Sequence, residues 1–155
     1  MPLSPQDERT FFVTSVAFGR RPLFQNTRMA ELLLDVLRHN RTQGRFLLHE
    51  FVIMPDHFHL LITPLAEVPL EKALQFVKGG FSFRAKKELE FHGEIWQLGF
   101  TNHRIKDAED YERHREYIRR NPVKRFLAER AELFPYSSAH PGAEIDRPPS
   151  WVVAP

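Results

Sequence analysis

The sequence predicts an α+β fold, in which a four-stranded antiparallel sheet carries helices on one face. Short segments rich in β-branched and aromatic residues alternate with segments whose apolar residues recur at helical spacing. A length of 155 residues suits one domain, and 42% hydrophobic residues is typical of a globular chain. The absence of cysteine excludes a disulfide scaffold, a thiolate zinc site and a cysteine nucleophile.

The first half of the chain is expected to supply a strand, a helix and a hairpin. Residues 10–18 are rich in strand-forming residues. Residues 27–40 have apolar positions at helical spacing, and Thr27 can cap the helix. Residues 45–54 and 57–63 predict two strands, because a Pro-Asp pair between them supplies turn chemistry.

The second half adds a helix, a strand and two further helices. A helix is expected over 69–90 and a strand over 94–105. Residues 107–120 form a polar helix with acids in its first turn and arginines in its last, as the helix dipole favours. The pair Asn121-Pro122 predicts a break, followed by a short final helix over 123–134.

The order β-α-β-β-α-β is the ferredoxin-like, split β-α-β arrangement, with an additional C-terminal helix here. It leaves one sheet face free for a site or for that helix. We expect a leader at residues 1–9, a single domain at 10–140 and a poorly ordered, Pro-rich tail at 141–155.

Two histidines stand at alternate positions of the third expected strand. Side chains at i and i+2 point to the same face, so His57 and His59 project together while Phe58 points into the core. Two neutral imidazoles at this spacing can bind one divalent ion. Taken alone, the pattern is more often that of a half-buried strand without a ligand.

The polar helix carries a second set of candidates. His114, Tyr117 and Asn121 are spaced i, i+3 and i+7, so they share one face. A tyrosine hydroxyl can be a nucleophile, and an asparagine amide oxygen can complete a metal site. A packed tyrosine, and an asparagine capping a following helix that begins at Pro122, account for the same residues.

Basic residues fall in clusters beside aromatic ones, which suits single-stranded nucleic acid because phosphates attract cations and bases stack on rings. The same residues can simply solvate the surface, and a net charge of +2 does not decide the matter. The expected DNA contacts are Lys78, Arg84, Lys86, Lys87, Arg119, Arg120 and Lys124.

Five segments, in this order, resemble the REP-associated tyrosine transposases and other single-tyrosine transposases with a His-hydrophobic-His (HUH) motif. They are VIMPDHFHLL at 52–61, FVKGGFSF at 76–83, IWQLGF at 95–100, YIRRNPVKRFLAERAELF at 117–134 and PYSSA at 135–139. The chain departs from the pattern at Asp56, where Asn is commoner, and at Phe126, which replaces a small residue or Gly. Neither departure is expected to touch the chemistry.

The resemblance implies that His57 and His59 are metal ligands, that Tyr117 is the nucleophile and that Asn121 is a third ligand. The implied reaction is metal-dependent cleavage and rejoining of single-stranded DNA at hairpin-flanking sites, through a 5′-phosphotyrosine intermediate. Imidazole, amide and phosphate ligands suit Mg²⁺ or Mn²⁺. We expect His114, one turn before the tyrosine, to be an accessory base.

The expected partner is single-stranded DNA that contains a hairpin, with no membrane partner. The protein is expected in the cytoplasm, associated with the nucleoid when bound to DNA, and as a monomer rather than a swapped dimer.

Three alternatives remain. A histidine-triad nucleotide hydrolase needs a third alternating histidine, and Leu61 occupies that position. A domesticated, catalytically inactive nucleic-acid-binding module would keep the fold without the chemistry. If Tyr117 is not the nucleophile, Tyr111 and Tyr136 are the remaining tyrosines.

Overall fold

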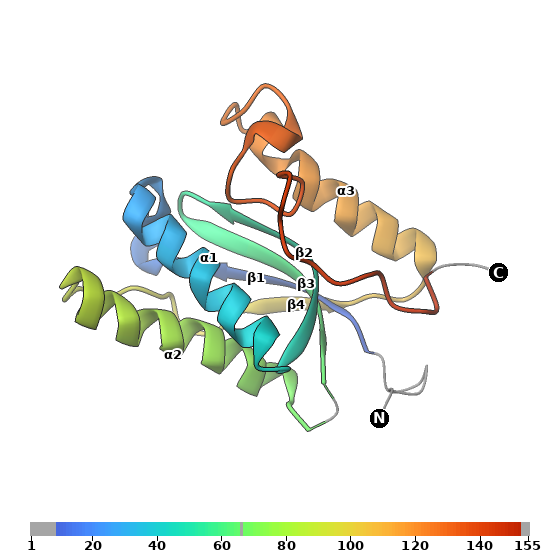
Figure 1. Cartoon of the computed structure of the whole chain (residues 1–155), viewed down its shortest axis with the longest axis horizontal. Helices are drawn as coiled ribbons and strands as arrows, with labels where there is room; N and C mark the ends of the chain where they lie inside the picture. The colour runs from blue at the N-terminus through green and yellow to red at the C-terminus, as the bar shows by residue number, and fades with distance from the viewer. Residues whose placement is uncertain (1–8, 66, 153–155) are drawn as a thin grey trace.

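The computed structural model describes residues 9–65 and 67–152. Four antiparallel strands form one sheet in the order β2-β3-β1-β4. The strands are β1 (Phe11–Val16), β2 (Phe46–Met54), β3 (His57–Pro64) and β4 (Thr101–Arg104). Helices α1 (Thr27–Thr42) and α2 (Leu70–Leu89) cover one face of the sheet, and α3 (Ala108–Lys124) lies across the other (Figure 1). The ferredoxin-like α+β fold predicted from the sequence is confirmed.

The alternation of β3 separates the core from the second face of the sheet. Phe58, Leu60 and Ile62 are buried against α1 and α2. Leu61 belongs instead to a smaller apolar cluster beneath α3. Because side chains of a strand alternate between faces, His57 and His59 share the α3 side with Leu61. The strand therefore builds the core with one set of residues and offers its two histidines to α3.

A register shift in β2 places a carboxylate on the same face. The pairing of β2 with β3 is irregular between Leu48 and Glu50. A bulge of this kind inserts one residue and reverses the alternation that follows it. Leu48 packs with α1 and α2, whereas Glu50 contacts Arg119 of α3.

Two boundaries differ modestly from the sequence prediction. The N-cap of α1 is Asn26 rather than Thr27, because the Asn26 side chain accepts a hydrogen bond from the Met29 amide at 3.2 Å. The strand expected over 94–105 is limited to β4. Trp96 makes only an isolated bridge to Ala17, and its ring packs against buried aromatic residues of the core.

The expected break at Asn121-Pro122 is wrong. Helix α3 continues through both residues and ends at Lys124. Proline removes one amide donor, but it lies within one turn of the end, where little helix remains to be disrupted. The final helix expected over 123–134 is also absent, and only a short 3₁₀ turn forms there, at Ala131–Leu133.

The described part of the Pro-rich tail packs against the domain, contrary to the expectation of poor order. Asp146 accepts two hydrogen bonds from Arg41 and one from the backbone amide of Leu48. The Arg147 carbonyl contacts a ring nitrogen of His49. The predicted leader lies, except for Arg9, outside the described residues, and so do residues 153–155 of the tail.

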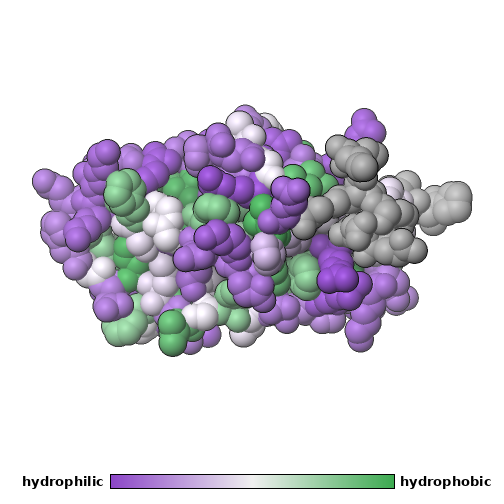
Figure 2. Space-filling view, turned by 90° about the horizontal axis from the view of Figure 1, so that it is seen from below, coloured by the Kyte–Doolittle hydropathy of each residue, from purple (hydrophilic) through white to green (hydrophobic). Residues whose placement is uncertain are grey.

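The surface seen from below Figure 1 is mainly hydrophilic, with hydrophobic side chains in separate spots (Figure 2). Among residues 9–65 and 67–152, no helix is long and apolar enough to cross a membrane.

Candidate active site

The two histidines of β3 lie side by side beneath α3. His57 and His59 are both buried, and their ring centroids are 4.7 Å apart. They pair across the sheet with Val16 and Thr14 of β1, respectively. Two imidazoles are thus held close together on a rigid strand, as the His-hydrophobic-His spacing predicted.

Hydrogen bonds at Nδ1 determine which nitrogen of His57 is free. His57 Nδ1 lies 2.6 Å from Asp56 Oδ1, and Arg20 pairs with the other carboxylate oxygen at 3.4 Å. Burial opposes ionisation of Asp56, but its contacts with His57 and Arg20 lower the pKa of that carboxyl. A carboxylate only accepts, so Nδ1 donates and the lone pair of neutral His57 is on Nε2. Asp56, at which the chain departs from the family pattern, therefore contacts a proposed metal ligand.

The second imidazole also has a hydrogen bond at Nδ1, here to a hydroxyl group, which can either donate or accept. His59 Nδ1 lies 2.8 Å from Thr14 Oγ1, while its Nε2 is buried without a hydrogen-bond partner among the described residues. Burial, together with electrostatic interactions with His57 and Arg125, lowers the pKa of His59 to about 3. The ring is therefore neutral near pH 7, which is the form that binds metal ions.

Tyr117 projects from α3 over this pair. Its ring centroid is 5.3 Å from that of His59, and 45% of the residue remains exposed to solvent. Phe12 of β1 lies within 6 Å, ring to ring, of His59, His114 and Tyr117. Phe12 therefore packs against all three rings and helps to hold their orientation.

The other tyrosines are poorly placed for the same chemistry. Tyr111 is 1% exposed in the cluster beneath α3, and burial raises the pKa of its hydroxyl. Tyr136 is partly buried against the core on the opposite face. Only Tyr117 combines exposure with closeness to the histidine pair.

Asn121 lies one turn after Tyr117 on the same face of α3 and is buried. Its amide nitrogen has no hydrogen-bond partner among the described residues. A buried side-chain NH2 group without a partner is rare. It is a donor that a water molecule or a phosphate oxygen can satisfy, whereas a metal ion would bind the Asn121 Oδ1 atom. Because Asn121 is inside the helix, it does not cap a following one.

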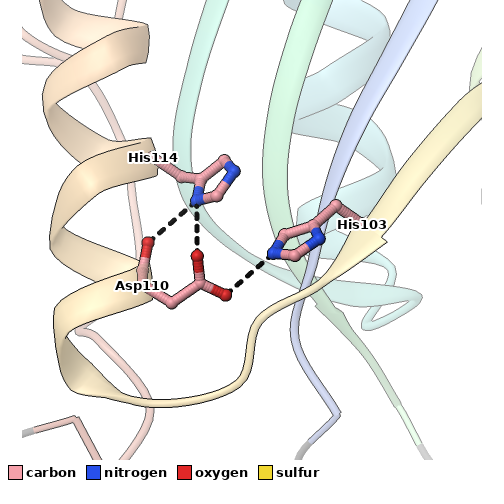
Figure 3. Close-up of side chains that lie close together, drawn as sticks. All are labelled: His103, Asp110 and His114. Atoms are coloured by element: carbon pink, nitrogen blue, oxygen red, sulfur yellow. Dashed lines mark hydrogen bonds and ion pairs between the residues drawn. The ribbon is translucent and has the colours of Figure 1, made fainter.

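His114 belongs to a cluster centred on Asp110 at the start of α3 (Figure 3). His103 Nε2 lies 2.8 Å from Asp110 Oδ2, and His114 Nδ1 lies 3.2 Å from Oδ1. One ligand atom from each residue falls within 4.8 Å of the others, a spacing that could hold a metal ion. His114 Nδ1 also lies 2.8 Å from the Asp110 carbonyl oxygen, which can only accept, so Nδ1 donates. We term His103, Asp110 and His114 the Asp110 cluster.

The predicted DNA contacts divide between the two sides of the sheet. Lys78, Arg84, Lys86 and Lys87 belong to α2, whereas Arg119, Arg120 and Lys124 belong to α3.

Several of these side chains already have protein partners. Arg84 pairs with Asp35 and Glu88, and Lys78 Nζ donates to the Gln97 and Gly99 carbonyl oxygens. Arg119 is bound to Glu50 at 2.8 Å. Lys86, Lys87, Arg120 and Lys124 are exposed.

Sequence reasoning missed the residues that support the site. Phe12 and Thr14 lie on a strand that is distant in sequence from the histidines, so only the pairing of β1 with β3 reveals them. Asp110 was detectable in principle, because it stands four residues before His114 on a predicted helix.

The ring nitrogens of the histidine pair could serve as ligands of a divalent ion. Both Nδ1 atoms contact oxygen atoms, which leaves the Nε2 atoms of His57 and His59 for a ligand, and Nε2 of His59 is buried without a hydrogen-bond partner among the described residues. His57, His59 and Asn121 are the residues that would hold the ion.

This chain is similar to known transposases. A family model described as "Transposase IS200 like" matches residues 11–121. A Haemophilus influenzae protein named as a REP-associated tyrosine transposase is 31% identical over 110 residues, covering 64% of this chain and 62% of that protein. The REP-associated tyrosine transposase of Escherichia coli is 26% identical over 132 residues, covering 84% of this chain and 76% of that protein. The match thus spans less than two thirds of the Haemophilus protein.

Solved structures share the fold. A REP-associated tyrosine transposase bound to a REP hairpin superposes with a TM-score of 0.74 at 24% identity, covering 95% of this chain and 88% of that one. A structure described as a transposase of Deinococcus radiodurans gives a TM-score of 0.56 at 18% identity, covering 76% of this chain and 95% of that one. The family model covers most of the chain, including both histidines and the tyrosine. The chain therefore belongs to the IS200-like transposases, a family of enzymes that includes its REP-associated tyrosine transposase relatives.

Proposed function

We propose that this protein is a metal-dependent, HUH-type tyrosine transposase that cleaves and rejoins single-stranded DNA through a 5′-phosphotyrosine intermediate. The observation that carries the proposal is the position of Tyr117. A half-exposed tyrosine ring lies 5.3 Å from the buried His59 ring, whose neighbour His57 completes the pair. This juxtaposition gives a phosphodiester access to a nucleophile and a metal site together.

The chemistry assigned to Tyr117 is transesterification. The hydroxyl oxygen bonds to phosphorus while the bond to the 3′ oxygen breaks, which leaves a 5′-phosphotyrosine and a free 3′-hydroxyl. Reversal by a 3′-hydroxyl rejoins the strand, so no external energy source is required. A divalent ion held by His57, His59 and Asn121, Mg²⁺ or Mn²⁺, would polarise the scissile phosphate and stabilise the leaving oxygen.

A neutral tyrosine hydroxyl is a weak nucleophile, so its proton must be removed. We assign this to His114, one turn before Tyr117 and in contact with the same Phe12 ring. Because His114 Nδ1 donates to Asp110, its lone pair lies on Nε2. Asp110 would then hold the ring in the tautomer required of a base.

The proposed DNA partner carries a hairpin with a single-stranded flank, as the hairpin-bound relative suggests. Arg120 and Lys124 would contact the strand near Tyr117, because both are exposed at the end of α3 that bears the site. Arg119 is also proposed as a DNA contact, although its side chain is already paired with Glu50. Lys78, Arg84, Lys86 and Lys87 form a second proposed set, which meets DNA on the α2 side of the sheet. We propose a cytoplasmic monomer that joins the nucleoid when it binds DNA.

The test of the chemistry is a denaturing-gel assay for a covalent protein–DNA adduct. Labelled hairpin oligonucleotides with single-stranded flanks are incubated with wild type, Tyr117→Phe and His57→Ala, with Mg²⁺, Mn²⁺ or chelator. We expect a metal-dependent adduct with wild type alone, and DNA binding retained by Tyr117→Phe. Tyr111→Phe serves as the matched control and keeps the adduct if it folds.

Two outcomes would contradict the proposal. An adduct with Tyr117→Phe would move the nucleophile to Tyr111 or Tyr136. Tight DNA binding by wild type without any adduct would favour an inactive binding module of the same fold.

The two proposed sets of DNA contacts can be separated by charge removal. We expect Arg120→Gln with Lys124→Gln, and separately Lys86→Gln with Lys87→Gln, to weaken binding for all sequences and to flatten its salt dependence. Each lost phosphate contact should reduce the slope of log affinity against log salt by about 0.7–0.9. A pair whose removal leaves both affinity and slope unchanged lies outside the DNA-binding surface.

A further inference from the structure

Phe126, just beyond the end of α3, has a backbone conformation and an environment that do not suit phenylalanine. Its φ is +60°, in the left-handed region. Its amide donates to the Val123 carbonyl at 3.1 Å, and the next amide, of Leu127, donates to the Pro122 carbonyl at 2.7 Å. These two bonds form a Schellman motif, whose left-handed position is normally glycine.

The Phe126 side chain has little packing against the described residues that could compensate for this conformation. Phe126 is 95% exposed. A residue with a Cβ in the left-handed region is strained, because Cβ approaches the backbone carbonyl oxygen. Positions that break a local rule without a structural gain are expected at functional sites.

The surroundings of Phe126 indicate what its ring could bind. Lys124 and Arg125, immediately before it, are both exposed. The Arg125 amide donates to the Asn121 carbonyl at 3.0 Å, so this cationic segment begins one turn from a proposed metal ligand.

The distance to the nucleophile fits a nucleic-acid strand. Tyr117 and Lys124 are seven residues apart on one helix, which at 1.5 Å per residue is about 10 Å along the axis. A single strand crosses such a distance in a few nucleotides. An exposed ring beside two cations matches the pairing of base stacking with phosphate contacts in proteins that bind single strands.

We propose that Phe126 is a base-stacking platform that holds an unpaired nucleobase of single-stranded DNA a few nucleotides from Tyr117, while Lys124 and Arg125 bind the neighbouring phosphates. The proposal rests on the proposed function, because it assumes that single-stranded DNA crosses the Tyr117 face. It adds a binding subsite that stacks on any base and so carries little sequence preference of its own.

The test compares two DNA probes and four variants. The probes share one hairpin stem, and one is blunt while the other carries single-stranded flanks of mixed sequence. The variants are Phe126→Gly, Phe126→Leu, Phe126→Trp and the control Glu90→Gly. Glu90 caps α2 with a φ of +53°, so glycine relieves the same backbone strain there, at the end of a helix on the opposite face.

Phe126→Gly should make the fold more stable and the complex weaker, a combination that a purely structural role does not produce. We expect a raised melting temperature together with a loss of fivefold or more, roughly the value of one stacked base, in affinity for the flanked probe only. Phe126→Leu should lose the same affinity, and Phe126→Trp should keep it. Glu90→Gly should raise the melting temperature without changing the ratio of flanked to blunt affinity.

A fluorescent base then locates the stacked nucleotide. With 2-aminopurine at one flank position at a time, wild type and Phe126→Trp should change the fluorescence at one position, whereas Phe126→Leu should not. Unchanged flanked-probe affinity in both Phe126→Gly and Phe126→Leu would overturn the proposal, as would an equal loss for the blunt probe. Wild type that binds the flanked probe but forms no adduct would reject the proposed chemistry and leave the stacking test intact.

Discussion

At the scale of single residues, the site is organised by oxygen atoms that orient imidazoles. Asp56 and Thr14 engage Nδ1 of His57 and His59, which leaves both Nε2 atoms for a ligand. Asp110 contacts Nε2 of His103 and Nδ1 of His114, and it also accepts hydrogen bonds from the Lys106 amide and from Arg113. These partners therefore orient the imidazole rings rather than take part in a reaction step, and the carboxylates also determine which ring nitrogen carries the proton.

Asp110 should make stability depend on acid pH. Burial opposes its ionisation, but hydrogen bonds from the Lys106 amide and from His103 lower the pKa of its carboxyl from 3.8 to about 2. A carboxyl whose pKa is lower in the folded state contributes stability above its unfolded pKa, and the contribution is lost as pH falls toward the folded value. Asp110→Asn should therefore cost about 1–2 kcal/mol at pH 7, after allowance for solvent screening, and much less at pH 2.

The measurement is the free energy of unfolding of both proteins between pH 2 and pH 7. Glu109→Gln is the matched control, since Glu109 is an exposed acid in the same helical turn. Its effect on stability should be small and nearly flat with pH. An Asp110→Asn cost that stays constant down to pH 2 would mean that the charge of Asp110 is not what stabilises the turn.

At the scale of elements, α3 is attached to the sheet through a buried carboxylate. Glu50 accepts from Arg119 at 2.8 Å and from the Ser138 hydroxyl at 2.6 Å, and Arg115 lies 3.5 Å away. Ser138 belongs to the segment after α3, so this one carboxylate joins β2, α3 and the C-terminal region. The bulge in β2 is what turns Glu50 toward them.

Removing Arg119 should destabilise the protein because Glu50 would stay buried with less compensation. Losing one partner of a buried pair costs about 3–5 kcal/mol, and the remaining Arg115 should reduce this to roughly 1–3 kcal/mol for Arg119→Ala. Adding Glu50→Gln should recover part of the loss in urea unfolding. The neighbouring exposed Arg120→Ala should change stability by less than about 0.5 kcal/mol.

The same pair of variants separates a structural role of Arg119 from a DNA contact. If Arg119→Ala with Glu50→Gln regains stability but still binds DNA weakly, Arg119 also serves the nucleic acid. If Glu50→Gln recovers no stability in the Arg119→Ala background, the carboxylate is not the element that holds α3.

At the scale of the whole molecule, one chain contains both halves of the site. Only residues 105–107 separate β4 from α3, and Ile118 of α3 packs in one cluster with Val52, Met54 and Leu61 of its own sheet. A tether this short, with a packed helix, favours a site assembled within a single chain. This geometry supports the proposed monomer over a swapped dimer.

Mixing two inactive variants tests the assembly directly. Tyr117→Phe and His57→Ala each lack one half of the site. When they are co-expressed and purified together, no adduct should form, because every chain keeps its own defect. A swapped dimer would instead combine the intact His57 of one chain with the intact Tyr117 of the other. Recovery of a substantial fraction of wild-type adduct would therefore overturn the monomeric arrangement.

One can predict from the sequence alone the order of the elements up to α3, the shared face of His57 and His59, and the candidacy of Tyr117. Those inferences rest on periodicities of two and 3.6 residues, which are local. The helix break that the sequence predicts at Asn121-Pro122 is wrong, because proline near a helix end is tolerated when the preceding turns are already packed.

The partners that complete the site can be identified only from the tertiary packing. Thr14 reaches His59 through strand pairing, Glu50 reaches Arg119 through a bulge, and Tyr117 reaches His59 because α3 packs over the sheet. Such contacts join residues that are far apart in sequence, and no local pattern records them. Local hydrogen bonding and side-chain alternation can be read along a chain, whereas the meeting of two distant segments depends on how the whole core is packed.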